Sequence, residues 1–473
     1  MAARRVVFVI QNEGVHSRHR PAEPFAARRR QRGMGLGSRT SRAALGAAVL
    51  AVLAVAGCGT IGRTQPAVPP VAVTKGVAVT EPAADPRPFG AADTAFGLDV
   101  LRAWCAQYPG QNLVFSPSTL ASALGMAYLG ARGATAAAMA GVLHLPAGDA
   151  TALAAGLQAR SDGLGGLDGP GVTLSASNQV WADPSLPPLA GYLNAVATGY
   201  GAGVARAPFL TDPSRAASLV NQVISADTRG HIGNLVSPGM LTDVGWVLTS
   251  ALYLDAKWAV PFDAGKTAPD PFTAAGGQKV TASYLSGVGF LYVKSGGWTA
   301  VSLPYAGGKL TMTALLPPAG SGSCALPTQA GLASITASLN TEGAGAQPGY
   351  AGRPGDLATV YLPKVNLAVN GPTGDMKAVL TKLGMGQAFG GAADFTGLSR
   401  KAGELAFVQQ AATLQVAEKG TVGAAAAAVG VYPASAEYDP VTIWFDRPYL
   451  MLVSAKSTGE PLFLAQVGNP AAS

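Results

Sequence analysis

The sequence predicts a single α+β domain with large, mainly antiparallel β-sheets. Three observations lead to this prediction. Apolar residues recur at three-to-four spacing near the start of the domain, which is typical of helices. Later segments are short, apolar and β-rich, which is typical of strands. From about Ala91 onward the 473-residue chain shows no second linker and no internal repeat, and its 48% hydrophobic content allows one sizeable core.

The positive charge of the chain lies in its first 57 residues. The formal net charge is +7, but this segment carries ten arginines against Glu13 and Glu23, a local balance of +8. Without the segment the charge is 7 − 8 = −1, so no nucleic-acid partner is expected for the rest of the chain. The arginines are Arg4, Arg5, Arg18, Arg20, Arg28, Arg29, Arg30, Arg32, Arg39 and Arg42.

Residues 1–57 are predicted to be an N-terminal extension that ends in a signal peptide. After Met34, two arginines precede the apolar residues 43–56, and a small-residue site ends at Cys58. The apolar stretch is short for a bilayer span. It resembles a bacterial lipoprotein signal, in which Cys58 becomes lipidated and anchors the chain to the membrane; an ordinary secretory signal is the alternative. Both readings place the mature chain outside the cytoplasm, either lipid-anchored or secreted.

The two segments beside this signal show no core pattern. Residues 1–33 indicate either an upstream start-site artefact, with Met34 as the true start, or a disordered extension. Residues 58–90 are rich in proline, alanine and valine without periodicity, and are predicted to be a semi-extended tether. The folded domain is therefore expected at residues 91–473.

Within the domain, the predicted elements follow in order from helices to strands. Residues 96–107 and 118–129 show helical spacing, and the second of these helices follows the helix-starting "FSPS". Apolar, β-rich runs bounded by Gly or Pro predict strands. These runs are residues 247–254, 309–316, 359–365 and 443–455.

A catalytic site finds little support in the sequence. His144 ends an apolar helix and His231 lies in a loop, and neither belongs to a nucleophile or zinc motif. No phosphate loop or zinc spacing is found, so no metal and no cofactor are expected. Cys105 and Cys324 could pair or remain separate thiols. A secreted hydrolase would need a catalytic constellation that the chain does not display, and a non-enzyme is expected.

Several ordered stretches resemble the serpin family. The stretch Asn112 to Leu145 resembles the early strand and helix of the family, and Thr228 to Phe262 resembles its central-sheet signature. "LPYAGGKLTMTALLP", "LPKVNL", "LTKLGMGQAF", "ADFTGLS" and "FDRPYLMLVSAKSTGEPLFLAQVGNP" follow in order. The resemblance covers nearly all of residues 91–471. It implies a metastable, monomeric serine protease inhibitor with about eight to nine helices and an exposed reactive loop.

The resemblance also implies a suicide-substrate mechanism. A target serine protease cleaves the reactive loop, and the loop inserts as a new central strand while still acylated to the protease. A strand that enters a sheet needs small side chains on its core face, and Thr421, Gly423, Ala425, Ala427 and Val429 satisfy this with period-two spacing. The predicted hinge residues are Glu418, Gly420, Thr421, Val422, Gly423, Ala424, Ala425 and Ala426.

The spacing of the family from Gly420 predicts a reactive bond between Ala434 and Ser435. Val431, Tyr432 and Pro433 would form the recognition sequence before it, with cleavage after Val431 as an alternative. A small alanine at the cut suits elastase- or subtilisin-like proteases with shallow apolar pockets. Cysteine-protease inhibition also occurs in this family and is not excluded by the loop.

Other family positions are predicted to control opening of the sheet. They are Ser116, Thr119, Ser250, Gln410, Trp258 and Lys364. Ser250 and Gln410 stand where the family has an Asn and a His, and are expected to form a neutral latch. Lys364 is expected to pair with Glu418. Val422 and Gly423 replace the frequent Glu and Ala of the family, so insertion is expected to be slower. The alternative function is a non-inhibitory serpin that is cleaved as a substrate or has a binding or scaffold role.

Overall fold

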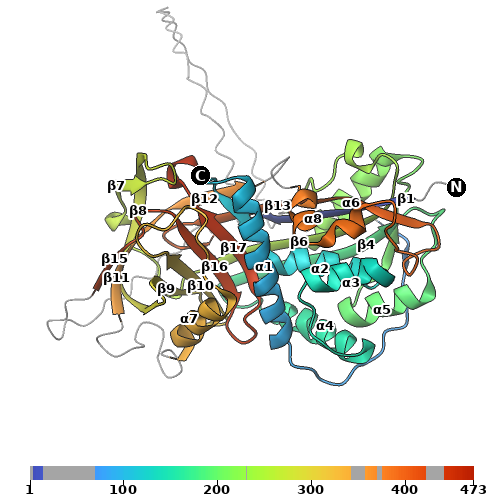
Figure 1. Ribbon diagram of the computed structural model, residues 1–473, viewed down its shortest axis with the longest axis horizontal. Helices are drawn as coiled ribbons and strands as arrows, with labels where there is room; N and C mark the ends of the chain where they lie inside the picture. Colours follow the sequence, from blue (N-terminus) through green and yellow to red (C-terminus); the bar gives the residue numbers. More distant parts are fainter. Residues whose placement is uncertain are drawn as a thin grey trace, which may run out of the picture. The chain divides into compact units, whose positions relative to one another are not determined.

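The computed structural model (Figure 1) describes residues 4–13, 70–228, 230, 232–341, 357–369, 375–421 and 441–473. The described part contains eight α-helices, two large sheets and short 3-10 turns. The helices are α1 (Arg87–Gln107), α2 (Pro117–Tyr128), α3 (Gly133–Val142), α4 (Ala150–Gly165), α5 (Ala190–Tyr200), α6 (Pro213–Asp227), α7 (Gln329–Thr341) and α8 (Lys377–Lys382).

The first sheet carries the features that matter for function. Its strand order is β12-β13-β1-β6-β4-β5-β2, and the short β14 pairs with β6. The strands are β12 (Val365–Val369), β13 (Ala402–Val416), β1 (Arg4–Glu13), β6 (Val244–Lys257), β4 (Val172–Ala182), β5 (Val204–Arg206), β2 (Val73–Thr74) and β14 (Gly420–Thr421).

The second sheet is mainly antiparallel and contains the last strands of the chain. Its order is β15-β11-β8-β9-β10-β16-β17-β3, with β7 paired to β8, and only β11 and β15 pair in parallel among its described strands. The strands are β15 (Val441–Trp444), β11 (Leu357–Pro363), β8 (Lys279–Ser295), β9 (Trp298–Pro304), β10 (Leu310–Leu316), β16 (Tyr449–Ala455), β17 (Pro461–Val467), β3 (Leu113–Phe115) and β7 (Ala268–Thr273).

The α+β prediction and its main elements are confirmed. The two predicted helices are α1, which begins earlier, and α2, where Ser116 is the N-cap and Pro117 follows at the first position. Two of the predicted strands are each two strands in the structure. Residues 359–365 divide at Lys364 after Pro363, and residues 443–455 divide between Trp444 and Tyr449, where Pro448 interrupts the run.

Strand β6 is buried on both faces. Trp246, Leu248 and Leu252 point into the large core shared with α1, α2 and the second sheet, whereas Val247 and Ala251 contact the smaller core under α6. This alternation follows from the two-residue period of a strand. Helices therefore cover both faces of the first sheet at its centre, which explains the nearly continuous apolar sequence of β6.

Two segments outside the predicted domain are part of the folded unit. Residues 4–13, for which the sequence shows no core pattern, form β1 between β13 and β6 (Figure 1). The second half of the predicted tether lies along α5, where the Val77 amide donates to Asn194 Oδ1 (2.9 Å) and β2 extends the sheet edge. A Cβ at Gly76 would lie 2.3 Å from the Leu193 backbone, so this close approach requires glycine.

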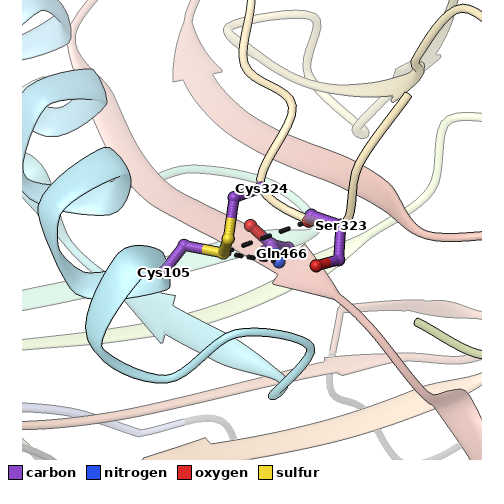
Figure 2. Close-up of a disulfide and its surroundings, with 4 residues drawn as sticks. All are labelled: Cys105, Ser323, Cys324 and Gln466. Atoms are coloured by element: carbon purple, nitrogen blue, oxygen red, sulfur yellow. Dashed lines mark hydrogen bonds between the residues drawn. A yellow bond between two sulfur atoms is a disulfide. The ribbon is translucent and has the colours of Figure 1, made fainter. Parts of the chain in front are cut away.

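Cys105 and Cys324 form a disulfide (Figure 2), which decides between the two alternatives left open by the sequence. Cys105 lies in the last turns of α1, and Cys324 lies in the loop between β10 and α7. The Gln466 amide of β17 donates to Cys105 Sγ at 3.1 Å. The bond thus ties the N-terminal helix to a loop 219 residues further along the chain.

Candidate functional site

The hinge of the predicted loop begins as a strand at the end of β6. Gly420 and Thr421 form β14, which is antiparallel to β6 with Gly420 opposite Lys257 and Thr421 opposite Ala256. The Trp258 amide donates to the Lys419 carbonyl (3.0 Å), and the Phe262 amide donates to the Glu418 carbonyl (2.8 Å). The main chain of residues 418–421 is therefore hydrogen-bonded to the end of β6 and to the segment that follows it.

Gly420 is required by its conformation and its contacts. Its φ is +155°, and a Cβ at this position would lie 2.1 Å from the Ala256 carbonyl oxygen. Any larger residue would push the hinge away from β6. The glycine therefore permits the close approach on which the pairing of β14 depends.

Thr421 is held by an aromatic pair next to the hinge. Its hydroxyl hydrogen-bonds with the hydroxyl of Tyr305, and both side chains are buried. The Tyr305 ring stacks on Trp258 with centroids 4.5 Å apart, and Trp258 Nε1 donates to the Ala417 carbonyl at 2.8 Å. Burial raises the pKa of Tyr305, so its hydroxyl remains protonated at neutral pH. The stacked pair thus holds the chain at Ala417, before the hinge, and at Thr421, within it.

Glu418 forms the ion pair that the sequence predicts. Lys364 Nζ lies 2.9 Å from Glu418 Oε1, and the Thr267 hydroxyl donates to the same oxygen at 3.0 Å. Partial burial acts to raise the pKa of Glu418, but the hydrogen bonds from Lys364, its own backbone and Thr267 lower it overall. The Lys364 side chain is 37% exposed, so water screens the pair and its net contribution is small.

Ser116 and Thr119 lie at the start of α2, behind the first sheet. Ser116 Oγ accepts from the Thr119 amide (3.2 Å), which caps the helix, and also contacts Ser118 Oγ at 3.1 Å. The Thr119 hydroxyl donates a hydrogen bond to the Ser116 carbonyl (3.3 Å). Both residues are buried, so any role in sheet opening acts through the position of α2.

Ser250 has a partner that the sequence did not predict. Its hydroxyl donates to Asn178 Oδ1 on the neighbouring strand β4 at 2.6 Å. Ile10 of β1 pairs with Ser250 on one side and with Gln410 on the other, so one strand separates the two predicted latch residues. The side chain of Gln410 lies outside the described part, and the predicted bond between them stays a prediction.

A buried ion cluster that was not predicted from the sequence lies behind the first sheet. Arg160 on α4 contacts Asp93 Oδ2 on α1 at 2.5 Å and Glu460 Oε1 at 3.0 Å. The same guanidinium donates to the Ser118 carbonyl (2.6 Å) and Ser122 Oγ (2.9 Å) of α2. Arg160 thus joins three helices to the segment before β17. Its partners lie up to 300 residues away, a separation that no local spacing reveals.

Opposing effects set the protonation of this cluster. Burial raises the pKa of Asp93 well above its usual range, against the attraction of Arg160, and Glu460 adds to the rise. Burial acts to lower the pKa of Arg160, but the two carboxylates raise it overall. One cation therefore faces two carboxyl groups, and Asp93 tends to keep its proton.

The remaining predicted residues lie elsewhere. Val422 to Ala426 of the hinge, the recognition residues Val431 to Pro433, the bond Ala434–Ser435 and Cys58 lie outside the described residues, as does His231. His144 Nε2 lies 2.9 Å from Asp99 Oδ2 on the surface of α1. Among the described residues, no cluster of three or more His, Cys, Asp or Glu has metal-binding geometry, and no helix is long and apolar enough to cross a membrane.

The family is decided by comparison with known proteins. A family model described as serpin (serine protease inhibitor) matches residues 91–470. The chain belongs to the serpin family. Its similarity to curated serpins spans their length: it is 29% identical to serine protease inhibitor A3N of Rattus norvegicus over 80% of this chain and 88% of the relative. It is 28% identical to leukocyte elastase inhibitor of Bos taurus, over 81% of this chain and 99% of the relative.

Solved serpin structures show the same fold. The native state of tengpin, a thermophilic serpin, aligns with a TM-score of 0.67 and 22% identity, covering 84% of this chain and 99% of tengpin. Human thyroxine-binding globulin in complex with thyroxine aligns with a TM-score of 0.64 and 23% identity, covering 82% of this chain and 100% of the globulin. The fold of the chain is therefore the serpin fold, in agreement with the family model, whose description is serine protease inhibitor.

Proposed function

We propose that the mature chain is an inhibitory serpin that traps serine proteases of elastase or subtilisin type as a suicide substrate. The target would attack the bond between Ala434 and Ser435 and form an acyl-enzyme. Insertion of the freed loop into the first sheet would then carry the acylated protease away before water releases it. Trapping requires that insertion be faster than deacylation.

The pairing of β14 with β6 is the observation that supports this proposal most. β14 is antiparallel to β6, so each further residue of the loop would face the preceding residue of β6. If the pairing continued from Thr421 opposite Ala256, residue 433 would face Val244 at the start of β6. Continued pairing would therefore use all 14 residues of β6 and end one residue before the predicted reactive bond. A strand of this length spans roughly 46 Å at ~3.3 Å per residue.

The sequence of the loop fits such a path. Between Thr421 and Val429 it contains Gly, Ala and Val, with no charged or bulky aromatic side chain. The core behind β6 is filled by Trp246, Leu248 and Leu252, so only small residues could be added without displacing them. Gly423 would lose more backbone entropy on insertion than another residue, which would slow insertion. The rate of insertion would decide whether the chain acts as an inhibitor or only as a substrate.

We also place the mature protein outside the cytoplasm, as a monomer anchored to a bacterial membrane through lipid on Cys58. The disulfide between Cys105 and Cys324 supports an oxidising compartment. The near-neutral charge of the chain after residue 57 gives no reason to expect another anchor.

The proposal is tested by incubating residues 58–473, the predicted mature chain, with pancreatic elastase and with subtilisin. Trapping predicts a covalent band at the summed mass on a denaturing gel and a released peptide that begins at Ser435. The control replaces Thr421 with Arg, because a charged side chain at this buried hinge position would stop insertion while leaving the loop cleavable.

A different outcome would favour the non-inhibitory alternative. If the wild-type chain is cleaved while the protease stays fully active, the loop is only a substrate, and the fold serves a binding or scaffold role.

A further inference from the structure

The position that the reactive loop would take in the first sheet is already filled. Strand β1, residues 4–13, lies between β6 and β13 and pairs in parallel with both (Figure 1). Arg5 to Glu13 face Val244 to Tyr253 of β6, and Arg4 to Asn12 face Ala402 to Ala412 of β13. The centre of the sheet is therefore closed by a segment of the predicted leader.

β1 and the loop compete for the same backbone groups. In the register of β14, residues 424–433 would face Tyr253 to Val244, which are the β6 residues that β1 now pairs with. β1 pairs with β6 as far as Tyr253, and β14 pairs with β6 from Ala256 onward. Only Leu254 and Asp255 of β6 lie between these two stretches. Each backbone N–H and C=O at this edge serves one neighbouring strand, so the two occupants exclude each other.

The sequences favour β1 while both segments are present. "RRVVFVI" is rich in β-branched and aromatic residues, whereas residues 424–428 are five alanines, a type depleted in strands. β1 also needs no cleavage to pair, whereas the loop is tied at both ends until a protease cuts it.

We propose that residues 4–13 plug the insertion site, so that the full chain is a protease substrate and becomes a protease trap only when its leader is removed. This inference rests on the proposed function. The predicted cleavage before Cys58, or translation from Met34, would each yield a chain without β1. Inhibition would then be confined to the processed protein, and unprocessed chains would leave neighbouring proteases active.

The test compares the full 473-residue chain with the double variant Val7→Pro/Ile10→Pro. Successive residues of a strand direct their N–H groups to opposite neighbours, so the two prolines remove a hydrogen bond toward each side. The double variant Ala22→Pro/Ala26→Pro, with both changes outside β1, gives the matched control. Hydrogen exchange, thermal unfolding and the yield of covalent elastase complex per cleaved chain are measured for all three proteins.

A plug predicts slow exchange of residues 4–13 and 244–253 in the wild-type chain and in the control. The Val7→Pro/Ile10→Pro variant should lose this protection, unfold several degrees lower, and give about tenfold more complex per cleaved chain. Rapid exchange of residues 4–13 in the wild-type chain overturns the inference, as does trapping by the full chain equal to that by residues 58–473. The exchange result on the wild-type chain needs no variant to fold.

The outcome also separates this inference from the proposed function. If residues 58–473 fail to trap any protease while residues 4–13 of the full chain exchange slowly, the proposed function fails and so does the gain of trapping on leader removal, but residues 4–13 still occupy the insertion site. If residues 58–473 trap and residues 4–13 exchange rapidly, inhibition stands and the plug fails.

Discussion

The hinge and the Arg160 cluster are two polar regions that hold the first sheet in opposite ways. At the hinge, Glu418 and Lys364 have side chains that are 17% and 37% exposed, and the contacts of Thr421 are single neutral hydrogen bonds. In the Arg160 cluster the side chains of Arg160, Asp93 and Glu460 are at most 6% exposed. Water can replace the contact between Glu418 and Lys364 as it breaks, but it does not reach the contacts of the Arg160 cluster.

Under the proposed mechanism, this difference separates the residues that would move during insertion from the residues that would stay in place. A loop that inserted next to β6 would have to rearrange the hinge, and the partly exposed ion pair between Glu418 and Lys364 would cost little to break. Helices α1, α2 and α4 lie behind the sheet, and separating a buried ion cluster between them would leave charges without water or partners. Under the proposed mechanism, the hinge would therefore rearrange while α1, α2 and α4 stay in place.

The largest effect is expected when the Arg160 cluster loses its cation. Arg160→Met would leave Asp93 and Glu460 together in a buried site, and we expect the free energy of unfolding to fall by about 3–5 kcal/mol. Urea unfolding of the mature chain measures this loss. Arg102→Met is the matched control, because Arg102 pairs with Asp99 on the exposed face of α1 and should change stability by less than about 1 kcal/mol. Equal losses in the two variants would contradict a special role for the cluster.

A smaller effect is expected at the hinge itself. Tyr305→Phe removes the hydroxyl that bonds Thr421 and leaves a buried threonine oxygen without this partner, at a cost of about 1–2 kcal/mol. Urea unfolding measures the change. Tyr361→Phe serves as control because that ring stacks on Trp444, away from the hinge. An unchanged stability in Tyr305→Phe would show that the bond to Thr421 contributes nothing.

The pH dependence of stability provides a third test, directed at the Arg160 cluster. The pKa of Asp93 is raised in the folded state, so above pH 4 the unfolded chain loses this proton first. Stability is therefore expected to fall as pH rises toward the folded pKa of Asp93. Asp93→Asn should flatten the decline and make the protein more stable than wild type at high pH. Parallel pH profiles of the two proteins would contradict this assignment.

The same two regions show what sequence analysis could and could not predict. The hinge was predicted because its parts, Gly420, Glu418, Lys364 and Trp258, occupy positions that match a family pattern. The partners Tyr305 and Asn178 and the Arg160 cluster were missed, since they meet only through tertiary packing across tens to hundreds of residues. β1 was missed for another reason: the arginines around "VVFVI" indicated a leader, and composition does not reveal which sheet edge a strand will find.

The smallest effect is expected for the ion pair at the hinge. Glu418→Gln should lower the free energy of unfolding at neutral pH by only about 0.5–1 kcal/mol, because Lys364 is partly exposed. The pKa of Glu418 is lowered, so its contribution is present above the unfolded pKa near 4.5 and is lost as pH falls through the folded pKa. The wild-type and variant stabilities should therefore converge in acid. A double-mutant cycle with Lys364→Met isolates the pair, and a coupling of several kcal/mol would group this bond with those of the Arg160 cluster, so that the hinge could no longer be the region that releases easily.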